Sequence, residues 1–141
     1  MTMTKINESF LIAIAIVLLV GILSGCGAYQ DKVRTSNEAA AILGLKVIHE
    51  QEEIRRNETK RYVPMDQLFR PADGIPPLSQ MNPGYRFEVR VRDGGKSFEA
   101  FAAPEQYGKT GRRSFYMNEA GVVRGGDKGG GEATATDSEV K

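Results

Sequence analysis

The first pattern along the chain is an uncharged apolar run close to its start. Residues 10–23 read FLIAIAIVLLVGIL, with Lys5 and Glu8 in front of the run. The run has roughly fourteen residues, which is short of the about twenty that cross a bilayer core and typical of the hydrophobic region of a signal peptide. It therefore predicts a segment that directs the chain out of the cytoplasm.

Four residues follow this run directly: Leu23, Ser24, Gly25 and Cys26. They resemble the lipobox of bacterial lipoproteins, in which a Leu and two small residues precede a Cys. The resemblance implies that the Cys26 sulfur is diacylated, that the bond before Cys26 is cut, and that the new N-terminus is often acylated. Two or three acyl chains, at about 0.8 kcal/mol per buried CH₂, hold a protein stably on a membrane. We therefore expect a signal peptide over residues 1–25 and membrane lipid as a partner through Cys26.

An uncleaved membrane helix is the alternative for the same segment. Extended through residue 28, the apolar stretch has about twenty residues, which is enough to span a bilayer core. The glycines at positions 21, 25 and 27 disfavour a continuous helix there, because glycine costs about 1 kcal/mol relative to alanine inside a helix.

The next segment, residues 26–34, is polar and is expected to form a tether. Thr35 and Glu38 then form a capping-box pattern, which predicts a helix with Thr35 as its N-cap. A stripe at helical spacing follows: Ala40, Leu43, Gly44, Val47, Ile48, Gln51 and Ile54. We expect a surface pair between Glu52 and Arg56, a helix end near residues 57–59, and packing of the stripe against another element.

Alternation of apolar and charged residues marks the second half of the chain. Residues 85–91 alternate with period two, which predicts a strand with one buried face. Asp93-Gly94-Gly95 predicts a hairpin turn into a second strand over residues 96–103. The inward side chains of that strand are expected to be Phe98, Ala100 and Ala102. Residues 113–117 and 122–124 predict a third and a fourth strand.

Together these elements predict an α+β domain over residues 35–124, with an N-terminal amphipathic helix packed on a small antiparallel β-meander. A short helix after Pro64 is expected to bury Leu68, and prolines and glycines make residues 70–83 a loop. The tail, residues 125–141, has no apolar periodicity and is rich in glycine and charge. We therefore expect this tail to be disordered.

Four segments of this domain resemble type IV pilins and type II secretion pseudopilins. They are residues 34–48, which contain NEAAAILGLKVI, residues 61–68 (RYVPMDQL), residues 84–91 (GYRFEVRV) and residues 101–124 (FAAPEQYGKTGRRSFYMNEAGVVR). In those families the corresponding segments form the amphipathic half of a long helix, the turn after it, the first strand and the closing strands. The resemblance implies a pilin-like head.

The chain departs from the pilin pattern at its start. A prepilin has a Gly before the Phe of its apolar run and a Glu at the fifth mature position. Here Ser9 precedes Phe10, and no Glu lies between Leu11 and Leu23. The first hypothesis is therefore a pilin-type head on a lipid anchor. The alternative is a minor pilin or pseudopilin that an uncleaved N-terminal helix holds in the membrane, acting in type IV pilus or type II secretion assembly.

Composition limits the chemistry. The chain has 19 Lys and Arg against 18 Asp and Glu, a formal net charge of +1, which argues against a general nucleic-acid binder. Its single Cys excludes an internal disulfide and a Cys-rich metal site. His49, beside Glu50 and Glu53, is the place to look for an envelope enzyme, but a lone His is more often an ordinary boundary residue. We expect no catalytic residue and no cofactor.

Two further patterns are candidate ligand-binding loops, one for calcium and one for phosphate, and neither matches the spacing that such a loop requires. Asp66, Asp73 and Asp93 match no calcium-binding loop spacing, and turn formation explains each of them, so no metal site is expected. The Gly-rich basic stretch over residues 108–113 is not a phosphate loop, because Ala103 stands where that motif needs its first Gly.

The sequence thus predicts a non-catalytic lipoprotein of the bacterial cell envelope. It is expected to be anchored to a membrane, with its domain facing the periplasm or the exterior. Envelope, secretion or pilus proteins are the expected protein partners.

Overall fold

The computed structural model describes residues 8–141, with the backbone alone for residues 8–26 and residue 71. The chain divides into two compact units, Met1–Lys32 and Val33–Lys141. Helix α1 (Glu8–Thr59) contributes to both units, and the other elements belong to the second, which we call the head. These are the short helices α2 (Met65–Leu68), η1 (Pro71–Asp73) and α3 (Leu78–Met81) and the strands β1 (Tyr85–Arg92), β2 (Ser97–Pro104), β3 (Arg113–Asn118) and β4 (Arg124–Asp127).

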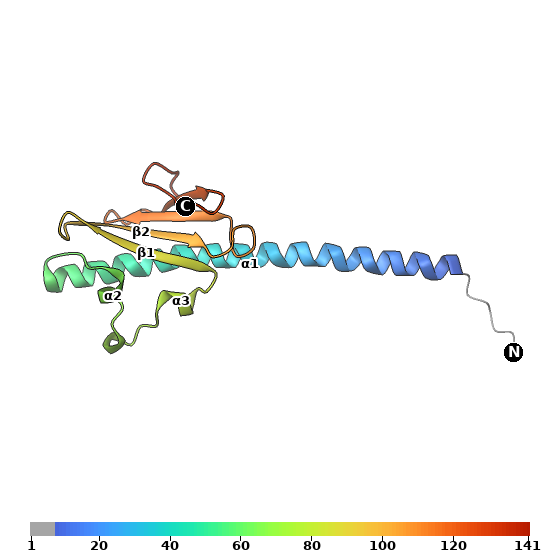
Figure 1. The fold of residues 1–141 in the computed structure, drawn as a ribbon, viewed down its shortest axis with the longest axis horizontal. Helices are drawn as coiled ribbons and strands as arrows, with labels where there is room; N and C mark the ends of the chain where they lie inside the picture. The colour runs from blue at the N-terminus through green and yellow to red at the C-terminus, as the bar shows by residue number, and fades with distance from the viewer. Residues whose placement is uncertain (1–7) are drawn as a thin grey trace. The chain divides into compact units, whose positions relative to one another are not determined.

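Within the head, α1 turns one side toward the sheet (Figure 1). Its buried positions recur every three or four residues, which is the spacing of one helix face. They include Ala41, Leu45, Ile48, Glu52 and Arg55. The helix ends within the predicted range, because Lys60 has a φ of 64° and its N–H donates to the Arg56 carbonyl at 2.8 Å. This left-handed residue closes the last turn in the manner of a C-terminal cap.

The start of the helix differs from the prediction. Residues 27–34 are helical, so Thr35 lies inside α1 and does not cap it. A Thr followed three residues later by a Glu is compatible with a helix interior as well as with a cap. Residues 28–34 contain neither Gly nor Pro, so nothing local stops a helix that arrives from upstream.

The four strands form one antiparallel sheet in the order β1-β2-β3-β4, so the predicted meander is confirmed. The predicted hairpin pairs Val89 with Ala100, and the next pairs Phe101 with Tyr116. The fourth strand lies slightly later than predicted, at Arg124–Asp127. Glycine is required within this strand, because a Cβ at Gly125 would overlap the Ser114 carbonyl oxygen of β3.

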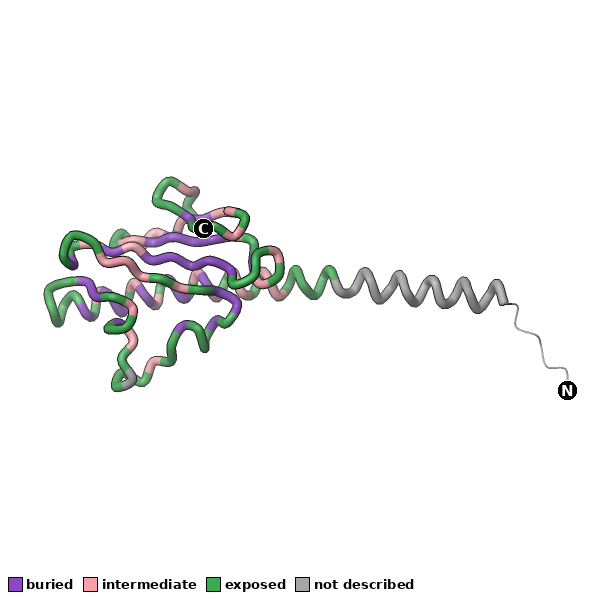
Figure 2. The backbone as a smooth tube through the Cα atoms, in the orientation of Figure 1, coloured by how far each residue is buried: buried purple, intermediate pink, exposed green. Residues whose placement is uncertain are grey.

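The core lies between α1 and one face of the sheet (Figure 2). The predicted inward residues Phe98, Ala100 and Ala102 are all buried there. Phe115 and Met117 join them from β3, and the short helices α2 and α3 each bury one leucine. The prediction of a short helix that buries Leu68 is confirmed.

The expected disorder of residues 125–141 is not what the structure shows. We call residues 128–141 the strap. The strap folds back along β4, where the Gly125 N–H donates to the Ser138 carbonyl at 3.0 Å and the Val140 N–H donates to the Val123 carbonyl at 2.9 Å. Ala133 is buried against Phe101 and Tyr116.

One glycine in the head is tightly enclosed and supplies a stability test. Gly111 is buried, and a Cβ there would overlap the ring and hydroxyl of Tyr85, whose hydroxyl donates to the Arg113 carbonyl at 2.7 Å. We expect Gly111→Ala to lower the free energy of unfolding by about 2 kcal/mol in urea denaturation, because overpacking a closed site forces its neighbours apart. Gly126→Ala is the matched control, since nothing lies within 4 Å of its added carbon. Equal effects of the two substitutions would contradict this account.

Candidate functional site

The lipobox residues Leu23, Ser24, Gly25 and Cys26 lie outside the part of the chain whose side chains the structure describes. Their predicted processing therefore stays a prediction. Among the residues that are described in full, no helix is long and apolar enough to cross a membrane.

His49 makes structural contacts. Its Nε2 lies 3.2 Å from the Glu119 carbonyl oxygen, a hydrogen bond in which Nε2 carries the proton. Its ring lies 6.2 Å from that of Phe98. Of its two acidic neighbours in sequence, Glu50 is exposed, and Glu53 accepts a hydrogen bond from the Tyr62 hydroxyl at 2.9 Å. His49 thus joins α1 to the turn after β3, and these contacts bring no acid to its ring.

The three aspartates considered for calcium are not gathered in one place. Asp73 pairs with arginines, and Asp93 accepts a hydrogen bond from the Ser97 hydroxyl at 3.3 Å in the β1–β2 turn. Across the residues with described side chains, no group of three or more His, Cys, Asp or Glu is placed to hold a metal ion.

The basic loop between β2 and β3 is fastened to α1. Arg34 donates to the Gly108 carbonyl at 2.6 Å, and the Asn37 amide donates to the Thr110 carbonyl at 2.9 Å. Glu38 Oε1 accepts the N–H groups of Arg112 and Arg113 at 3.0 and 3.2 Å. In a phosphate loop, backbone N–H groups are free to bind an anion. Here two of these N–H groups already donate to the Glu38 carboxylate.

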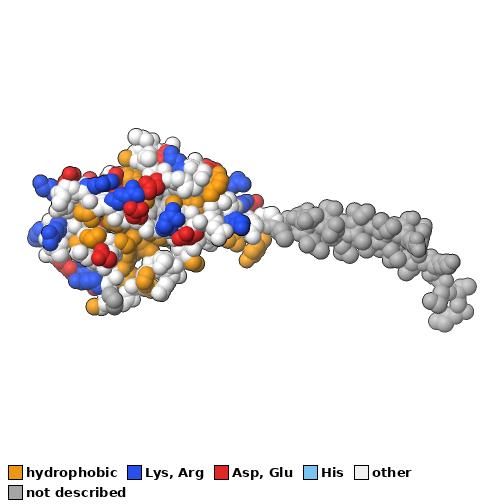
Figure 3. Space-filling model, in the orientation of Figure 1, with side chains coloured by type: hydrophobic (Ala, Val, Ile, Leu, Met, Phe, Trp, Pro, Cys, Tyr) orange, Lys and Arg blue, Asp and Glu red, His pale blue; other side chains and the backbone are white. Residues whose placement is uncertain are grey.

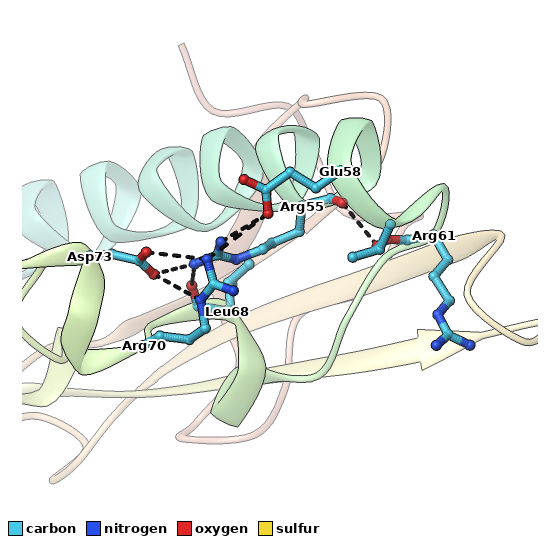
Figure 4. A network of polar contacts seen from close by, with 7 residues as sticks. Arg55, Glu58, Arg61, Leu68, Arg70 and Asp73 are labelled. Carbon is cyan, nitrogen blue, oxygen red and sulfur yellow. Dashed lines mark hydrogen bonds and ion pairs between the residues drawn. The ribbon is translucent and has the colours of Figure 1, made fainter.

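A polar cluster fastens the C-terminal end of α1 to the segment that follows it (Figure 4). Arg55 is only 4% exposed. It pairs with Asp73 and with Glu58, the latter at 3.2 Å, and it donates to the Leu68 carbonyl at 3.3 Å. Arg70 reaches the same Asp73 at 3.3 Å. The hydrogen bond from Arg70 lowers the pKa of Asp73 most. Burial opposes this shift, and the hydrogen bond and charge of Arg55 add to it.

One turn earlier, Glu52 is a fully buried carboxyl. Its Oε2 accepts the Val63 N–H at 3.0 Å, whereas Oε1 has no hydrogen-bond partner among the described residues. Burial raises its pKa to about 7, the Val63 N–H opposes this shift, and the nearby charge of Glu53 adds to it. The predicted surface pair of Glu52 with Arg56 is wrong, because Glu52 faces inward and Arg56 pairs with Glu53 at 3.6 Å.

An apolar groove runs between α1, α3 and β1. A cavity of about 210 Å³ is lined by predicted stripe residues of α1, by α3 and by β1, and its lining includes Leu43, Val47, Leu78, Met81 and Phe87. Leu43 is 61% exposed and Met81 46%. A second cavity of about 310 Å³ shares Leu78 and Phe87 with the first. On the face shown in Figure 3, hydrophobic side chains accordingly form a patch bordered by charged ones.

Sequence periodicity identified part of this groove and none of the buried polar cluster. Leu43 and Val47 belong to the predicted stripe, but that pattern does not say which stripe residues the sheet covers. Arg55 and Glu52 lie in a charged stretch that is typical of a solvated helix face. Only their helical spacing from Ile48, four residues to Glu52 and three more to Arg55, indicates that they face inward.

The comparisons with known proteins return no relative. No family model matches the chain, and neither a curated protein nor a solved structure matches it. What the structure does establish is the architecture: a long N-terminal helix packs on a four-stranded antiparallel sheet, which is a pilin-like topology.

Proposed function

We propose that this chain is a non-catalytic lipoprotein of the bacterial cell envelope, anchored through Cys26 and carrying a pilin-like interaction head. The observation that carries the proposal is the order of the segments. An uncharged run over residues 10–23 leads into Leu23-Ser24-Gly25-Cys26, and a folded α+β head follows. A signal segment, a lipid-accepting thiol and a domain held outside the cytoplasm follow in the order that a lipoprotein requires.

The surface of the head supports a role in binding. Leu43 and Met81 are exposed apolar side chains that line the same groove. Contiguous exposed apolar surface of this kind marks interaction sites, because folded proteins rarely leave it in contact with water. The buried polar groups described above serve structural contacts. Envelope proteins and membrane lipid are the partners that this proposal assigns.

A second candidate function is favoured by one specific observation. Helix α1 has bounds Glu8–Thr59 and continues through Cys26 into the residues that were expected to form a tether. A minor pilin or pseudopilin would keep such a helix intact and use it to remain in the membrane during type IV pilus or type II secretion assembly. In that case Cys26 would be an unmodified residue of the helix.

Intact mass spectrometry of the protein extracted from bacterial membranes separates the two candidates. For the lipoprotein we expect a mature species that begins at Cys26 and carries added acyl mass, and we expect Cys26→Ala to remain uncleaved and unacylated. Ser36→Ala, an exposed position outside the lipobox, is the control and should mature normally. A full-length, unacylated chain in the wild type would overturn the lipoprotein and support the membrane-held pilin relative.

A further inference from the structure

The strap covers a surface on the side of the sheet that faces away from α1. Side chains alternate across a sheet, so Phe101 and Tyr116 point away from the core that Ala100, Ala102 and Phe115 fill. Their rings lie 5.5 Å apart at an angle of 68°. Ala133 of the strap is only 1% exposed between them. Without the strap, these two rings would face solvent.

Arg90 forms the polar half of the same surface. Its guanidinium donates to both oxygens of Glu132, at 3.0 and 2.5 Å, and to both oxygens of Glu88, at 2.6 and 3.0 Å. It also lies 4.3 Å from the centre of the Phe101 ring. A guanidinium stacked on an aromatic ring and bound to a carboxylate through two hydrogen bonds is a strong carboxylate-recognition geometry.

The edge of β4 forms the third part. Its two backbone hydrogen bonds to this edge, Gly125 N–H to the Ser138 carbonyl and Val140 N–H to the Val123 carbonyl, place Glu139 opposite Arg124 in an antiparallel bridge. This is the way in which an extended peptide adds a strand to a sheet. We call Arg90, Phe101, Tyr116 and the β4 edge the strap seat.

The strap is held by contacts that are individually weak. In the pair of Arg90 with Glu132, Glu132 is exposed and Arg90 is partly exposed, and ion pairs in contact with solvent contribute about 1 kcal/mol or less. Ala133 buries little area, and Gly129, Gly130 and Gly131 lose more conformational freedom on ordering than other residues. Few of its contacts bury much area, so local opening of the strap should cost less free energy than opening of the central strands β2 and β3.

We propose that the strap seat is a docking surface for an extended acidic segment of a partner protein, and that the strap covers this surface until the partner displaces it. The partner must present a carboxylate to Arg90, a small side chain to the two rings and a short strand to β4. The strap itself, with Glu132, Ala133 and residues 138–140, is the template for that chemistry. The inference is independent of Cys26 and of how the chain is anchored.

Binding of a labelled peptide to the full chain in detergent micelles tests this proposal. The probe is the strap sequence GGEATATDSEVK, followed by fluorescence anisotropy. In the wild type the attached strap competes at an effective concentration of about millimolar. We expect Ala133→Lys, which places a cation beside Arg90, to open the strap and bind the peptide about tenfold more tightly or better. Ala135→Lys, at an exposed strap position, should bind as the wild type does.

Three outcomes would overturn the proposal. The first is no peptide binding to Ala133→Lys, and the second is binding that survives when Arg90→Gln is added. The third is a concentration-dependent dimer of the wild type that Ala133→Lys abolishes, since the occupant would then be the strap of a second copy. A peptide with Gln in place of the Glu that corresponds to Glu132 should bind about fivefold more weakly.

Amide hydrogen exchange of the wild-type protein provides a second test, which does not depend on whether the variants fold. We expect the amides of residues 132–140 to exchange faster than those of β2 and β3, because the strap opens without the sheet. Equal protection of the strap and the central strands would overturn its role as a displaceable cover.

Discussion

Replacing Arg55 with Met should lower the free energy of unfolding of the head by about 3 kcal/mol. The methionine keeps much of the apolar stem but removes the guanidinium that serves Asp73, Glu58 and the Leu68 carbonyl. Removing one member of a buried charge cluster costs about 3–5 kcal/mol, because the groups left behind keep their desolvation cost without a partner. The lower end applies here, since Arg70 still reaches Asp73. Urea denaturation followed by circular dichroism measures the change.

The neighbouring arginine provides a matched control for this experiment. Arg56→Met changes an exposed side chain that pairs with Glu53 at 3.6 Å and lies 5.2 Å from the Tyr62 ring centre. Contacts of this exposed kind contribute about 1 kcal/mol or less. If Arg55→Met cost no more than Arg56→Met, the polar cluster would not be what fastens α1 to the α2–η1 segment.

Stability of the head should fall as pH rises from 5 to 8, by up to about 3 kcal/mol, because of Glu52. The pKa of this carboxyl is raised from 4.5 to about 7 by burial. A raised folded pKa means that the folded state holds the proton more tightly than the unfolded state. The stabilising contribution is therefore complete below the unfolded value and is lost as pH rises through the folded value. Urea denaturation across this pH range measures the slope.

Glu52→Gln isolates the contribution of that single group. The amide oxygen still accepts the Val63 N–H and has no proton to lose, so we expect the variant to show a much flatter profile and greater stability at pH 8. The acids with lowered pKa, Asp73, Asp127, Glu132 and Asp137, have the opposite sign and act at lower pH. Identical pH profiles for the variant and the wild type would mean that Glu52 does not titrate in this window.

The fold could be predicted where its signal was local. Period-two alternation in residues 85–91 and the glycines of the Asp93-Gly94-Gly95 turn define the first hairpin, since strand pleat and turn geometry depend on neighbouring residues. The strap gave no such signal. The strap is bound through contacts such as that of Glu132 with Arg90, two residues far apart in sequence. Its glycine-rich composition is as compatible with an ordered segment as with disorder.

Polar groups of the head were harder to predict than its apolar core. The sequence places Glu52 and Arg55 in a charged stretch, where an exposed helix face is the ordinary outcome. They are buried because the segment that follows α1 returns over them and supplies Val63, Leu68 and Asp73 as partners. Those partners follow a turn whose direction no local pattern determines. Burial of charge therefore depends on tertiary structure that periodicity does not encode.

The two edge strands of the sheet determine whether neighbouring copies of the protein can aggregate by pairing their sheets. Confinement to a membrane plane, as the proposed anchor requires, makes copies collide far more often than in solution. Exposed strand edges would then join sheet to sheet and aggregate. On β1 the charged residues Arg86, Glu88 and Arg90 line the edge strand, and on β4 the strap occupies the hydrogen-bonding positions. Charged side chains on one edge strand and the strap on the other thus protect the sheet against edge-to-edge pairing between neighbouring copies.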